Sequence, residues 1–459
     1  MRRLFAKLAG RGGRLVLTAS LALLALGQTA GWSPARAAAP EVIVLTDIGQ
    51  DPDDTQSLIR MLLYSNELSI KGILPTYIPK GPVRPDLVNA VLDAYGKDLG
   101  RLRQHDPNFP TAALLKNRVK PGLNLNNKVG KGYDSAAAQH IVYMVDQSQG
   151  PIWVLVWGGI RELAQAIYNV KSTRSEAAFI AFQRKLRVYS ISLSQYSPEP
   201  GQYLMDNAKE MFWIASIEHD GSKSATFRGM YLLGDQSMQN ETWLKANILN
   251  RGNLGRMYPL NTTEKGLKEG DSPSFLHILP IGLSDPELPK GGGWGGRYTK
   301  EAEYYKISKN LYTSKGLLDE VNGVKSRRMA VARWRPAYQA DFAARVRWLE
   351  TNYAQANHPP VAKLASAANV TVKPGGKVTL DASKSSDPDG DGLSYRWWIY
   401  KEVSNYYDSV KIDNANSAKA TLTAPGTALS TPLNVILEVT DNGSPRLTRY
   451  QRVLVNVQN

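Results

Sequence analysis

The chain has 459 residues, of which 42% are hydrophobic and 21% are charged, and it contains no cysteine. This length accommodates two or three domains with cores of their own, and the composition is that of a globular protein, not of a disordered one. Without cysteine, disulfides, thiolate zinc sites and a cysteine nucleophile are excluded. The formal net charge is +15, but the chain has no Lys/Arg run with interleaved aromatics. We therefore assign the positive charge to a solvated surface and not to a nucleic-acid site.

The first 37 residues have the order of an export signal. Basic residues open the segment, the apolar run Val16 to Leu26 follows, and Ala35-Arg36-Ala37 offers small residues for cleavage. Arg2-Arg3 resembles the twin-arginine export pattern, although ordinary Sec export fits equally well. No apolar run approaches the roughly 20 residues that a membrane-spanning helix needs. We therefore expect residues 1–37 to be removed and the protein to be periplasmic or extracellular, without a membrane span.

Residues 41–355 are predicted to form an α/β domain. Apolar runs and helical periodicity indicate strands at 41–45, 70–74, 152–157 and 186–191 and helices at 55–64, 160–170 and 339–353. Strands that alternate with helices predict a mostly parallel sheet with helices on both faces. Residues 221–328 are rich in Gly, Pro and Asn and predict long loops with short helices.

The C-terminal part of the chain, residues 361–459, has a different texture. The segment Asn357 to Pro360 predicts an extended linker, and short β-type runs separated by turn residues follow it. These runs predict an immunoglobulin-like β-sandwich. Within it, the aspartates of Asp387-Pro388-Asp389-Gly390-Asp391-Gly392 suggest a calcium site, but this string is also common as a turn between strands, and we favour the turn.

Four aspartates lie between the first expected strand and the first expected helix. They are Asp47, Asp51, Asp53 and Asp54. Their mutual repulsion can be offset by a helix N-terminus, at about 0.3 to 1 kcal/mol for each charge, or by a hard cation such as Ca²⁺ that accepts oxygen ligands. The alternative is a simple helix cap by Asp53 or Asp54. We favour a cation site, because α/β proteins bind ligands beyond the carboxyl ends of their strands.

The segment Thr46 to Asp54 resembles the D-T-D-P-G-x-D-D opening of the calcium-dependent nucleoside hydrolases. Further segments are similar to those of a subgroup of secreted, nucleoside-hydrolase-like proteins described as cellulose-binding: Trp157-Gly158-Gly159, Glu269 to Leu276, Gly292 to Arg297, Arg333 to Gln339 and Ala356 to Pro360. Together they extend over nearly the whole chain that follows the export signal. The resemblance implies a nucleoside-hydrolase-like domain and an immunoglobulin-like domain that binds cellulose.

The resemblance also implies roles for individual aspartates. Asp47 would be a calcium ligand and the general base, Asp54 and Asp271 would be calcium ligands, and Asp53 would contact sugar hydroxyls. A main-chain carbonyl near Arg161 would be a further ligand. The implied function is calcium-dependent hydrolysis of an N- or O-glycosyl bond in a nucleoside or a carbohydrate.

One segment departs from the pattern of the subgroup and supports a different function. After the strand at 186–191 the subgroup carries an acidic D-Q-D-D segment, whereas this chain reads Ser192 to Glu199 with several carboxylates missing. The alternative to an enzyme is therefore a carbohydrate-binding protein without turnover. The sequence leaves the glycan and the oligomeric state open.

Aromatic residues add candidate sugar-binding positions. Trp294 stands among five glycines, a setting that favours an exposed platform on which a sugar can stack. Trp157 follows the end of a strand, and a position in a pocket or in the core fits it equally well. The five histidines are scattered without zinc spacing, and His277 is assigned no role beyond core or surface.

Overall fold

A computed structural model describes residues 38–459, except 80, 193–196, 217–223, 264–265 and 302–309. Residues 39–459 form one compact unit. The expected export signal lies outside the described residues. Among the helices that the structure describes, none has both the length and the apolar character that crossing a membrane requires.

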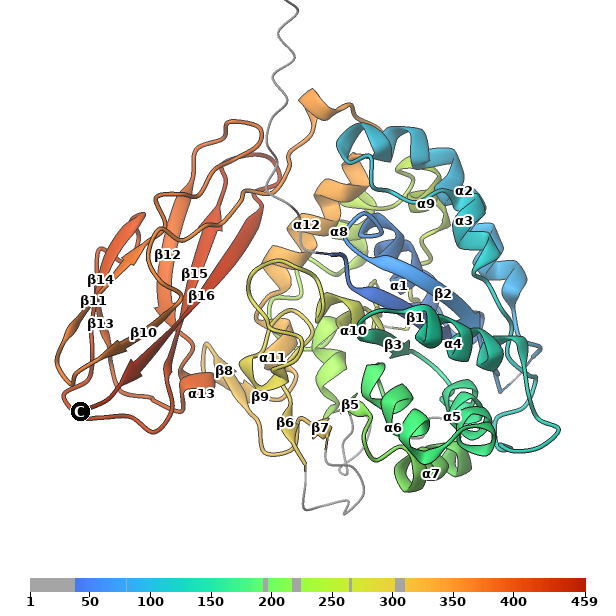
Figure 1. The fold of residues 1–459 in the computed structure, drawn as a ribbon. Helices are drawn as coiled ribbons and strands as arrows, with labels where there is room; N and C mark the ends of the chain where they lie inside the picture. The colour runs from blue at the N-terminus through green and yellow to red at the C-terminus, as the bar shows by residue number, and fades with distance from the viewer. Residues whose placement is uncertain (1–37, 80, 193–196, 217–223, 264–265, 302–309) are drawn as a thin grey trace, which may run out of the picture. The chain divides into compact units, whose positions relative to one another are not determined.

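A seven-stranded sheet forms the centre of the α/β domain, in the order β2-β1-β3-β4-β5-β7-β6 (Figure 1). Neighbouring strands pair in parallel, except for β6 and β7, which are antiparallel. The strands are β1 (Glu41–Thr46), β2 (Ser69–Pro75), β3 (Ile152–Val156), β4 (Leu186–Ser190), β5 (Phe212–Ala215), β6 (Thr299–Lys300) and β7 (Leu311–Thr313). The prediction of a mostly parallel sheet is confirmed.

Helices pack on both faces of this sheet, as predicted. Successive residues of β1 point to opposite faces, so Val42 and Val44 enter one hydrophobic cluster while Ile43 and Leu45 enter another. The first cluster includes residues of α1 (Asp53–Leu63), α2 (Pro85–His105) and α12 (Arg335–Arg347). The second includes residues of α4 (Ala136–Gln147), α5 (Arg161–Thr173) and α6 (Glu176–Lys185).

The remaining elements of this domain are short. The helices are α3 (Ala112–Asn117), α7 (Pro198–Asn207), α8 (Glu241–Asn247), α9 (Gly252–Met257), α10 (Ser272–Leu276) and α11 (Met329–Ala332), with 3-10 turns η2 (Thr226–Met230), η3 (Pro289–Gly291) and η4 (Tyr353–Gln355) and a small hairpin of β8 (Asp319–Val321) and β9 (Val324–Ser326). Most of them lie between β5 and α12, where the sequence predicts loops and short helices.

Helices α1 and α12 begin earlier than the sequence predicts. Helix α1 begins at Asp53, and Pro52 occupies its N-cap position without a side-chain hydrogen bond, so the alternative of an aspartate cap is wrong. Helix α12 begins at Arg335, four residues before the expected start, and ends at Arg347. Its second residue is Pro336, which the first turn of a helix tolerates because the N–H there has no helical partner.

The C-terminal domain is a sandwich of two sheets, ordered β10-β16-β15-β12 and β11-β14-β13. The strands are β10 (Asn369–Val372), β11 (Lys377–Asp381), β12 (Ser394–Ile399), β13 (Lys411–Asp413), β14 (Lys419–Thr423), β15 (Leu433–Thr440) and β16 (Thr448–Val457), with the short helix α13 (Lys401–Ser404) after β12. Leu380 and Leu422 of the smaller sheet share a core with Val435 and Val453 of the larger one. The predicted β-sandwich is confirmed.

The larger sheet of the sandwich also packs against the α/β domain. Ile436 and Tyr450 belong to the hydrophobic cluster of α1 and α12 and not to the core of the sandwich. Arg449 Nη1 donates to the buried Asp341 of α12 at 2.6 Å, and Arg452 Nη2 donates to the carbonyl oxygen of Leu283 at 2.8 Å. The sandwich is therefore joined to the α/β domain by both apolar packing and buried polar contacts.

Candidate functional site

The acidic loop lies at the carboxyl end of β1. β1 ends at Thr46, Asp47 follows, and the chain turns into α1 at Asp53. Strand β3 lies beside β1, and the backbone N–H of Trp157 donates to the carbonyl oxygen of Leu45 at 2.9 Å. This pairing brings the Trp157-Gly158-Gly159 segment next to Asp47 at the edge where parallel sheets bind ligands.

A third segment, from far along the chain, reaches the same place. Asp271 occupies the N-cap position of α10, and Ser272 Oγ lies within hydrogen-bond distance of Ser57 Oγ of α1, at 3.1 Å. The charge of Asp271 interacts with those of Asp47 and Asp54. Asp47, Asp54 and Asp271 are 4%, 2% and 1% exposed, so the three predicted ligands are buried, and they are close enough for their charges to interact.

Burial dominates the electrostatics of these three carboxyls. It raises the pKa of Asp47 to about 7, and the nearby charge of Asp51 adds to the effect. Burial also raises the pKa values of Asp54 and Asp271, and the repulsion between the carboxylates raises both further. The hydroxyl of Thr46 donates to Asp54, which offsets part of this cost. Three carboxyls in such a setting favour either protonation or a bound cation.

Lys268 lies beside the outer carboxylates of the loop, Asp51 and Asp53, which together with the inner Asp54 offer oxygens within 4.8 Å of one another. Its ammonium group forms an ion pair with Asp51 and lies 3.7 Å from Asp53 Oδ2. Among the described residues, no Lys or Arg forms an ion pair with the inner aspartates, and no hydrogen-bond donor reaches Asp271 Oδ2. An oxygen that is buried without a donor fits a hard cation, which coordinates carboxylate oxygens.

Sequence reasoning missed Lys268. The signal was present, because Lys268 lies three residues before Asp271 and directly before the segment Glu269 to Leu276 that the resemblance assigns to the site. A lysine so close to a predicted ligand is expected to accompany it into the site, where its charge can pair with carboxylates that do not bind metal.

A buried polar network holds the segment before Asp271 against α1. The guanidinium of Arg60 donates to Glu269, and both side chains are fully buried. Tyr258 OH also donates to Glu269, at 2.5 Å, as does Ser272 Oγ at 2.8 Å. These three donors use most of the four lone-pair sites of the Glu269 carboxylate. The network therefore holds Glu269 in place, and with it the chain directly before Asp271.

The two tryptophans predicted to bind sugar lie in the core. Trp157 is 1% exposed, and its Nε1 donates to Ser274 Oγ at 2.8 Å. Trp294 is fully buried, in T-shaped contact with Tyr338 and Tyr450. The glycines around Trp294 serve close packing, since a Cβ atom at Gly295 would lie 2.4 Å from the carbonyl oxygen of Pro273. Neither ring offers an open face, so the structure does not support stacking at these positions.

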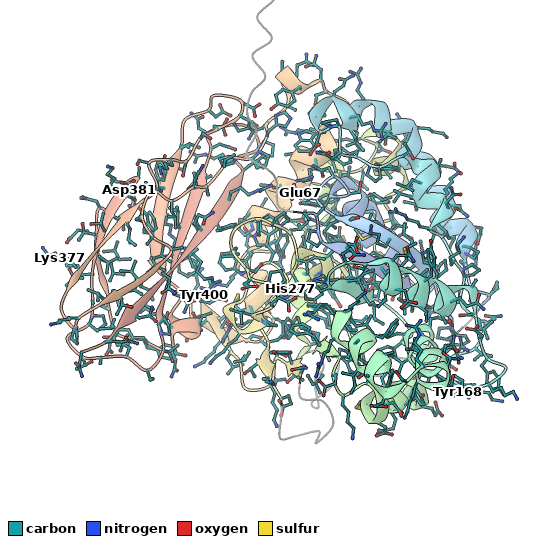
Figure 2. The ribbon with its side chains drawn as sticks, in the orientation of Figure 1. Glu67, Tyr168, His277, Lys377, Asp381 and Tyr400 are labelled. Carbon is teal, nitrogen blue, oxygen red and sulfur yellow. The ribbon has the colours of Figure 1, made fainter. Side chains whose placement is uncertain are left out.

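Other residues of the predicted site take structural positions or lie outside the described residues. Arg161 begins α5, and its buried guanidinium contacts Glu162 at 2.7 Å and the carbonyl oxygen of Lys128 at 2.9 Å. Residues 193–196 of the segment Ser192 to Glu199 lie outside the described residues. His277 is a core residue, 1% exposed and surrounded by packed side chains (Figure 2). Burial lowers its pKa to about 4.

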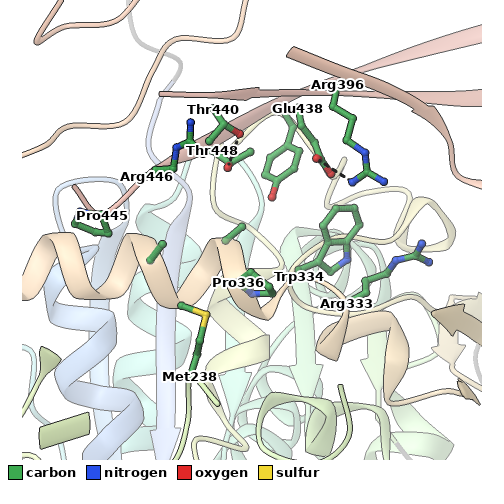
Figure 3. A pocket seen from close by; sticks show the side chains of 13 residues that line it. Met238, Arg333, Trp334, Pro336, Arg396, Glu438, Thr440, Pro445, Arg446 and Thr448 are labelled. Carbon is green, nitrogen blue, oxygen red and sulfur yellow. Dashed lines mark hydrogen bonds and ion pairs between the residues drawn. The ribbon is translucent and has the colours of Figure 1, made fainter. Parts of the chain in front are cut away.

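A pocket of about 490 Å³ lies where α12 faces the larger sheet of the sandwich (Figure 3). The aromatic side chains of Trp334 and Tyr450 and the charged side chains of Arg333, Arg396 and Glu438 line it. Arg396 Nη1 lies 3.4 Å from Glu438 Oε2. The lining of the pocket includes none of the aspartates of the acidic loop, so the pocket and the carboxylate cluster are separate candidate sites.

Two parts of the chain match known protein families. Residues 41–298 match the family described as "Cellulose-binding Sde182, nucleoside hydrolase-like domain". Residues 377–457 match the family described as "Cellulose-binding protein Sde0182, C-terminal domain". No curated protein matches the chain.

Among solved structures, a nucleoside hydrolase-related hypothetical protein from Saccharophagus degradans, associated with carbohydrate metabolism, is 35% identical. The match covers 92% of this chain and 100% of that one, with a TM-score of 0.77. An inosine-uridine preferring nucleoside hydrolase from Bacillus anthracis is 14% identical over 48% of this chain and 75% of its own, with a TM-score of 0.30. The PKD domain of the KIAA 1837 protein is 26% identical over 21% of this chain and 89% of its own, with a TM-score of 0.17.

Proposed function

Because the chain belongs to the family of cellulose-binding proteins with a nucleoside hydrolase-like domain, we propose that it is a calcium-dependent hydrolase of glycosyl bonds, acting on a nucleoside or a carbohydrate. The observation that carries the proposal is the cluster of Asp47, Asp54 and Asp271. These carboxyls are buried together, their charges repel one another, and no described Lys or Arg forms an ion pair with them.

The ligand chemistry of the cluster favours Ca²⁺ over softer metals. The candidate ligands are carboxylate oxygens, which suit hard cations, and the chain contains no cysteine that could supply a thiolate. Asp271 Oδ2, buried without a donor, would bind the ion together with oxygens of Asp47 and Asp54. When bound, the ion would supply positive charge that lowers the pKa of a nearby water.

The side chains divide the remaining work between them. Asp47, at the end of β1, would accept the proton of the attacking water, which is the work of a general base. Asp53 is only half-buried at the rim of the cluster and would contact sugar hydroxyls. Lys268, paired with Asp51 and close to Asp53, would orient these rim carboxylates. The reacting centre would be an anomeric carbon with oxocarbenium character.

Calcium binding to the full chain tests the metal assignment. Isothermal titration of chelator-treated protein should show that Asp54→Asn binds one Ca²⁺ fewer than the wild type. The matched control is Asp86→Asn on α2, whose exposed carboxylate pairs with Arg84 away from the core. An Asp54→Asn protein that binds as many ions as the wild type would overturn the assignment.

A second candidate function is carbohydrate binding without turnover, and the description of the family as cellulose-binding favours it. The pocket beside α12 offers charged and aromatic side chains for such a ligand. In a sedimentation assay with insoluble cellulose, Arg396→Met, which alters the pocket lining, should then weaken retention of the whole protein. Lys411→Met, at an exposed position of the other sheet, should not. If the wild type itself stays in solution, this candidate is excluded.

We also propose that residues 1–37 direct export. Sequencing the N-terminus of the protein recovered from the periplasm or the medium should then give a chain that begins close to Ala38. A chain that retains Met1 and remains in the cytoplasm would contradict export.

A further inference from the structure

A second group of carboxylates lies in the β-sandwich, in the loop between β11 and β12. Oxygen atoms of Asp387, Asp389 and Asp391 lie within 4.8 Å of one another. Asp387 Oδ1 accepts the backbone N–H groups of Asp389 and Asp391, at 2.8 and 3.1 Å. This is the turn that the sequence favours, but it uses only one oxygen of Asp387. Asp387 Oδ2 is buried, and no hydrogen-bond donor among the described residues reaches it.

A fourth carboxylate, Asp441, lies at the end of β15 and is fully buried. Its Oδ1 accepts the backbone N–H of Leu447 at 3.0 Å and that of Gly443 at 3.1 Å, and the amide of Asn357 at 3.2 Å. Its Oδ2 is buried without a donor among the described residues. An unpaired oxygen on a fully buried carboxylate costs several kcal/mol unless a cation or a proton compensates it.

The linker before the sandwich contributes a third unpaired oxygen. Asn357 donates through Nδ2 to Asp441 and to the carbonyl oxygen of Pro445, while its Oδ1 is buried without a donor in the described structure. Asp387 Oδ2, Asp441 Oδ2 and Asn357 Oδ1 therefore come from three separate segments, and each is an acceptor that no donor satisfies. One such atom is unremarkable in a native protein, but three from converging segments indicate a common ligand.

Backbone contacts show that the three segments meet at one corner of the sandwich. The linker pairs with the acidic loop, since Val361 N–H donates to the carbonyl oxygen of Ser386 at 2.8 Å. On the other side, Gly392 N–H donates to Asn442 Oδ1 at 2.8 Å, beside Asp441. The charge of Asp387 is one of the causes that raise the pKa of Asp441, after burial, so the two carboxyls act on each other.

The surrounding residues leave this charge uncompensated. Among the described residues, no Lys or Arg forms an ion pair with Asp387, Asp391 or Asp441. Asp389 accepts hydrogen bonds from His358, from the backbone N–H at 2.6 Å and from Nδ1 at 2.9 Å, which orients its carboxylate over the loop. The acceptors are all carboxylate or amide oxygens, the set that Ca²⁺ binds in flexible geometry with 6 to 8 ligands.

We propose that a Ca²⁺ ion binds at this corner of the sandwich, between the loop of Asp387 and Asp391 and the buried Asp441. Asn357 Oδ1 and Asp389 complete the oxygen set. This site is separate from the carboxylate cluster of the α/β domain and does not depend on the function proposed for that cluster.

The ion would join the linker to the sandwich. Asn357 also accepts, through its carbonyl oxygen, the indole N–H of Trp348 at 3.1 Å, and Trp348 directly follows α12. His358 stacks on Tyr353, with ring centroids 3.9 Å apart. A cation bound to Asn357 and Asp441 therefore stabilises the connection between the two domains, and its loss would loosen the linker.

Calcium titration of the full chain with two single variants tests the site. Asp387→Asn keeps the acceptor that forms the turn and replaces only the unpaired oxygen, so it should lose one bound Ca²⁺ and leave the melting temperature in chelator unchanged. Asp413→Asn, an exposed aspartate of β13, is the matched control and should bind as the wild type does. In the wild type, Ca²⁺ should raise the melting temperature and slow proteolysis of the linker, and Asp387→Asn should reduce both effects.

The Asp54→Asn protein separates this site from the other one. It should still bind one Ca²⁺, and the double variant Asp54→Asn, Asp387→Asn should bind none. If Asp54→Asn binds no Ca²⁺ up to millimolar concentrations, where extracellular modules bind, the sandwich site does not exist. The same conclusion follows if Asp387→Asn binds as many ions as the wild type. If the wild type binds one ion and only Asp387→Asn loses it, the sandwich site stands and the metal assignment of the α/β domain fails.

Discussion

The backbone of Gly158 packs directly against the carboxylate of Asp47: a Cβ atom on Gly158 would lie 2.3 Å from Asp47 Oδ1. No real Cβ contact is that short, so any side chain at this position would displace Asp47. The neighbouring Gly159 is less confined, because the nearest atom to its Cβ would be Ser197 Oγ, at 3.3 Å. The Trp157-Gly158-Gly159 segment therefore shapes the carboxylate site through one of its two glycines.

Gly158→Ala should abolish calcium binding at the α/β site and any hydrolysis, because Asp47 can no longer reach its position. Gly159→Ala is the matched control. It should retain calcium binding and hydrolysis, since the hydroxyl of Ser197 can shift by a few tenths of an ångström to make room for the methyl group. Titration calorimetry and a hydrolysis assay on each variant measure the effect. Equal calcium binding by the two alanine variants would show that the position of Asp47 does not matter for the metal.

Asp47→Asn tests the general base. The amide keeps the shape of the carboxylate, so the fold should persist, while loss of a general base costs about 10² to 10⁴ in rate. The assay is hydrolysis of a panel of nucleosides and aryl glycosides, with melting temperatures recorded for both proteins. An active wild type with an equally active Asp47→Asn would remove this residue from the mechanism, and a wild type inactive on the whole panel would favour the binding function.

The buried pair of Arg60 and Glu269 should contribute strongly to stability. Arg60→Met leaves Glu269 buried without its cation, and breaking a buried pair in this way costs about 3 to 5 kcal/mol. The control is Arg184→Met, whose partner Glu210 and whose own guanidinium are solvent-accessible, so the change should be about 1 kcal/mol or less. Urea unfolding of both variants gives the free energies. Similar losses in the two would mean that the network around Glu269 rearranges without cost.

The parts of the site that could be predicted from sequence are local ones. The apolar run of β1, the aspartates after it and the start of α1 follow one another within 25 residues, so strand, loop and helix can be assigned from spacing alone. The sheet and the sandwich follow from the alternation of strands with helices and then with turns. Asp271 was assigned from its resemblance to a family motif, because nothing local indicates that it packs beside α1.

The parts that could not be predicted depend on long-range packing. The ion pair of Arg60 with Glu269 joins residues 209 positions apart, and no spacing rule links them. Trp294 was misjudged because glycines suggest an open loop, whereas at Gly295 they allow the chain to approach α10 closely. In the sandwich, the turn formed by Asp387 Oδ1 was expected, but the unpaired oxygens become visible only when the linker and the end of β15 pack beside it.

His277 should make the protein less stable in mild acid. Burial lowers its pKa in the folded state to about 4, from 6.5 in the unfolded chain, and the ring packs against Trp153 and Tyr189. Between these pH values the unfolded state binds the proton that the native state excludes, so stability falls as pH falls from 6.5 toward 4. Above pH 6.5 the ring is neutral in both states and has no effect on stability, and the full penalty, reached below pH 4, is about 3 kcal/mol.

The measurement is the free energy of unfolding between pH 4 and pH 7 for the wild type and for His277→Phe, which cannot titrate. The other histidines and the carboxyls contribute equally to both proteins, so the difference between the two pH profiles isolates His277. The phenylalanine variant should lose less stability over this range, even if the loss of the hydrogen bond to the carbonyl oxygen of Pro286 makes it less stable at pH 7. Parallel profiles would show that His277 is not protonated on unfolding in this range, and that its burial does not set the acid sensitivity of the fold.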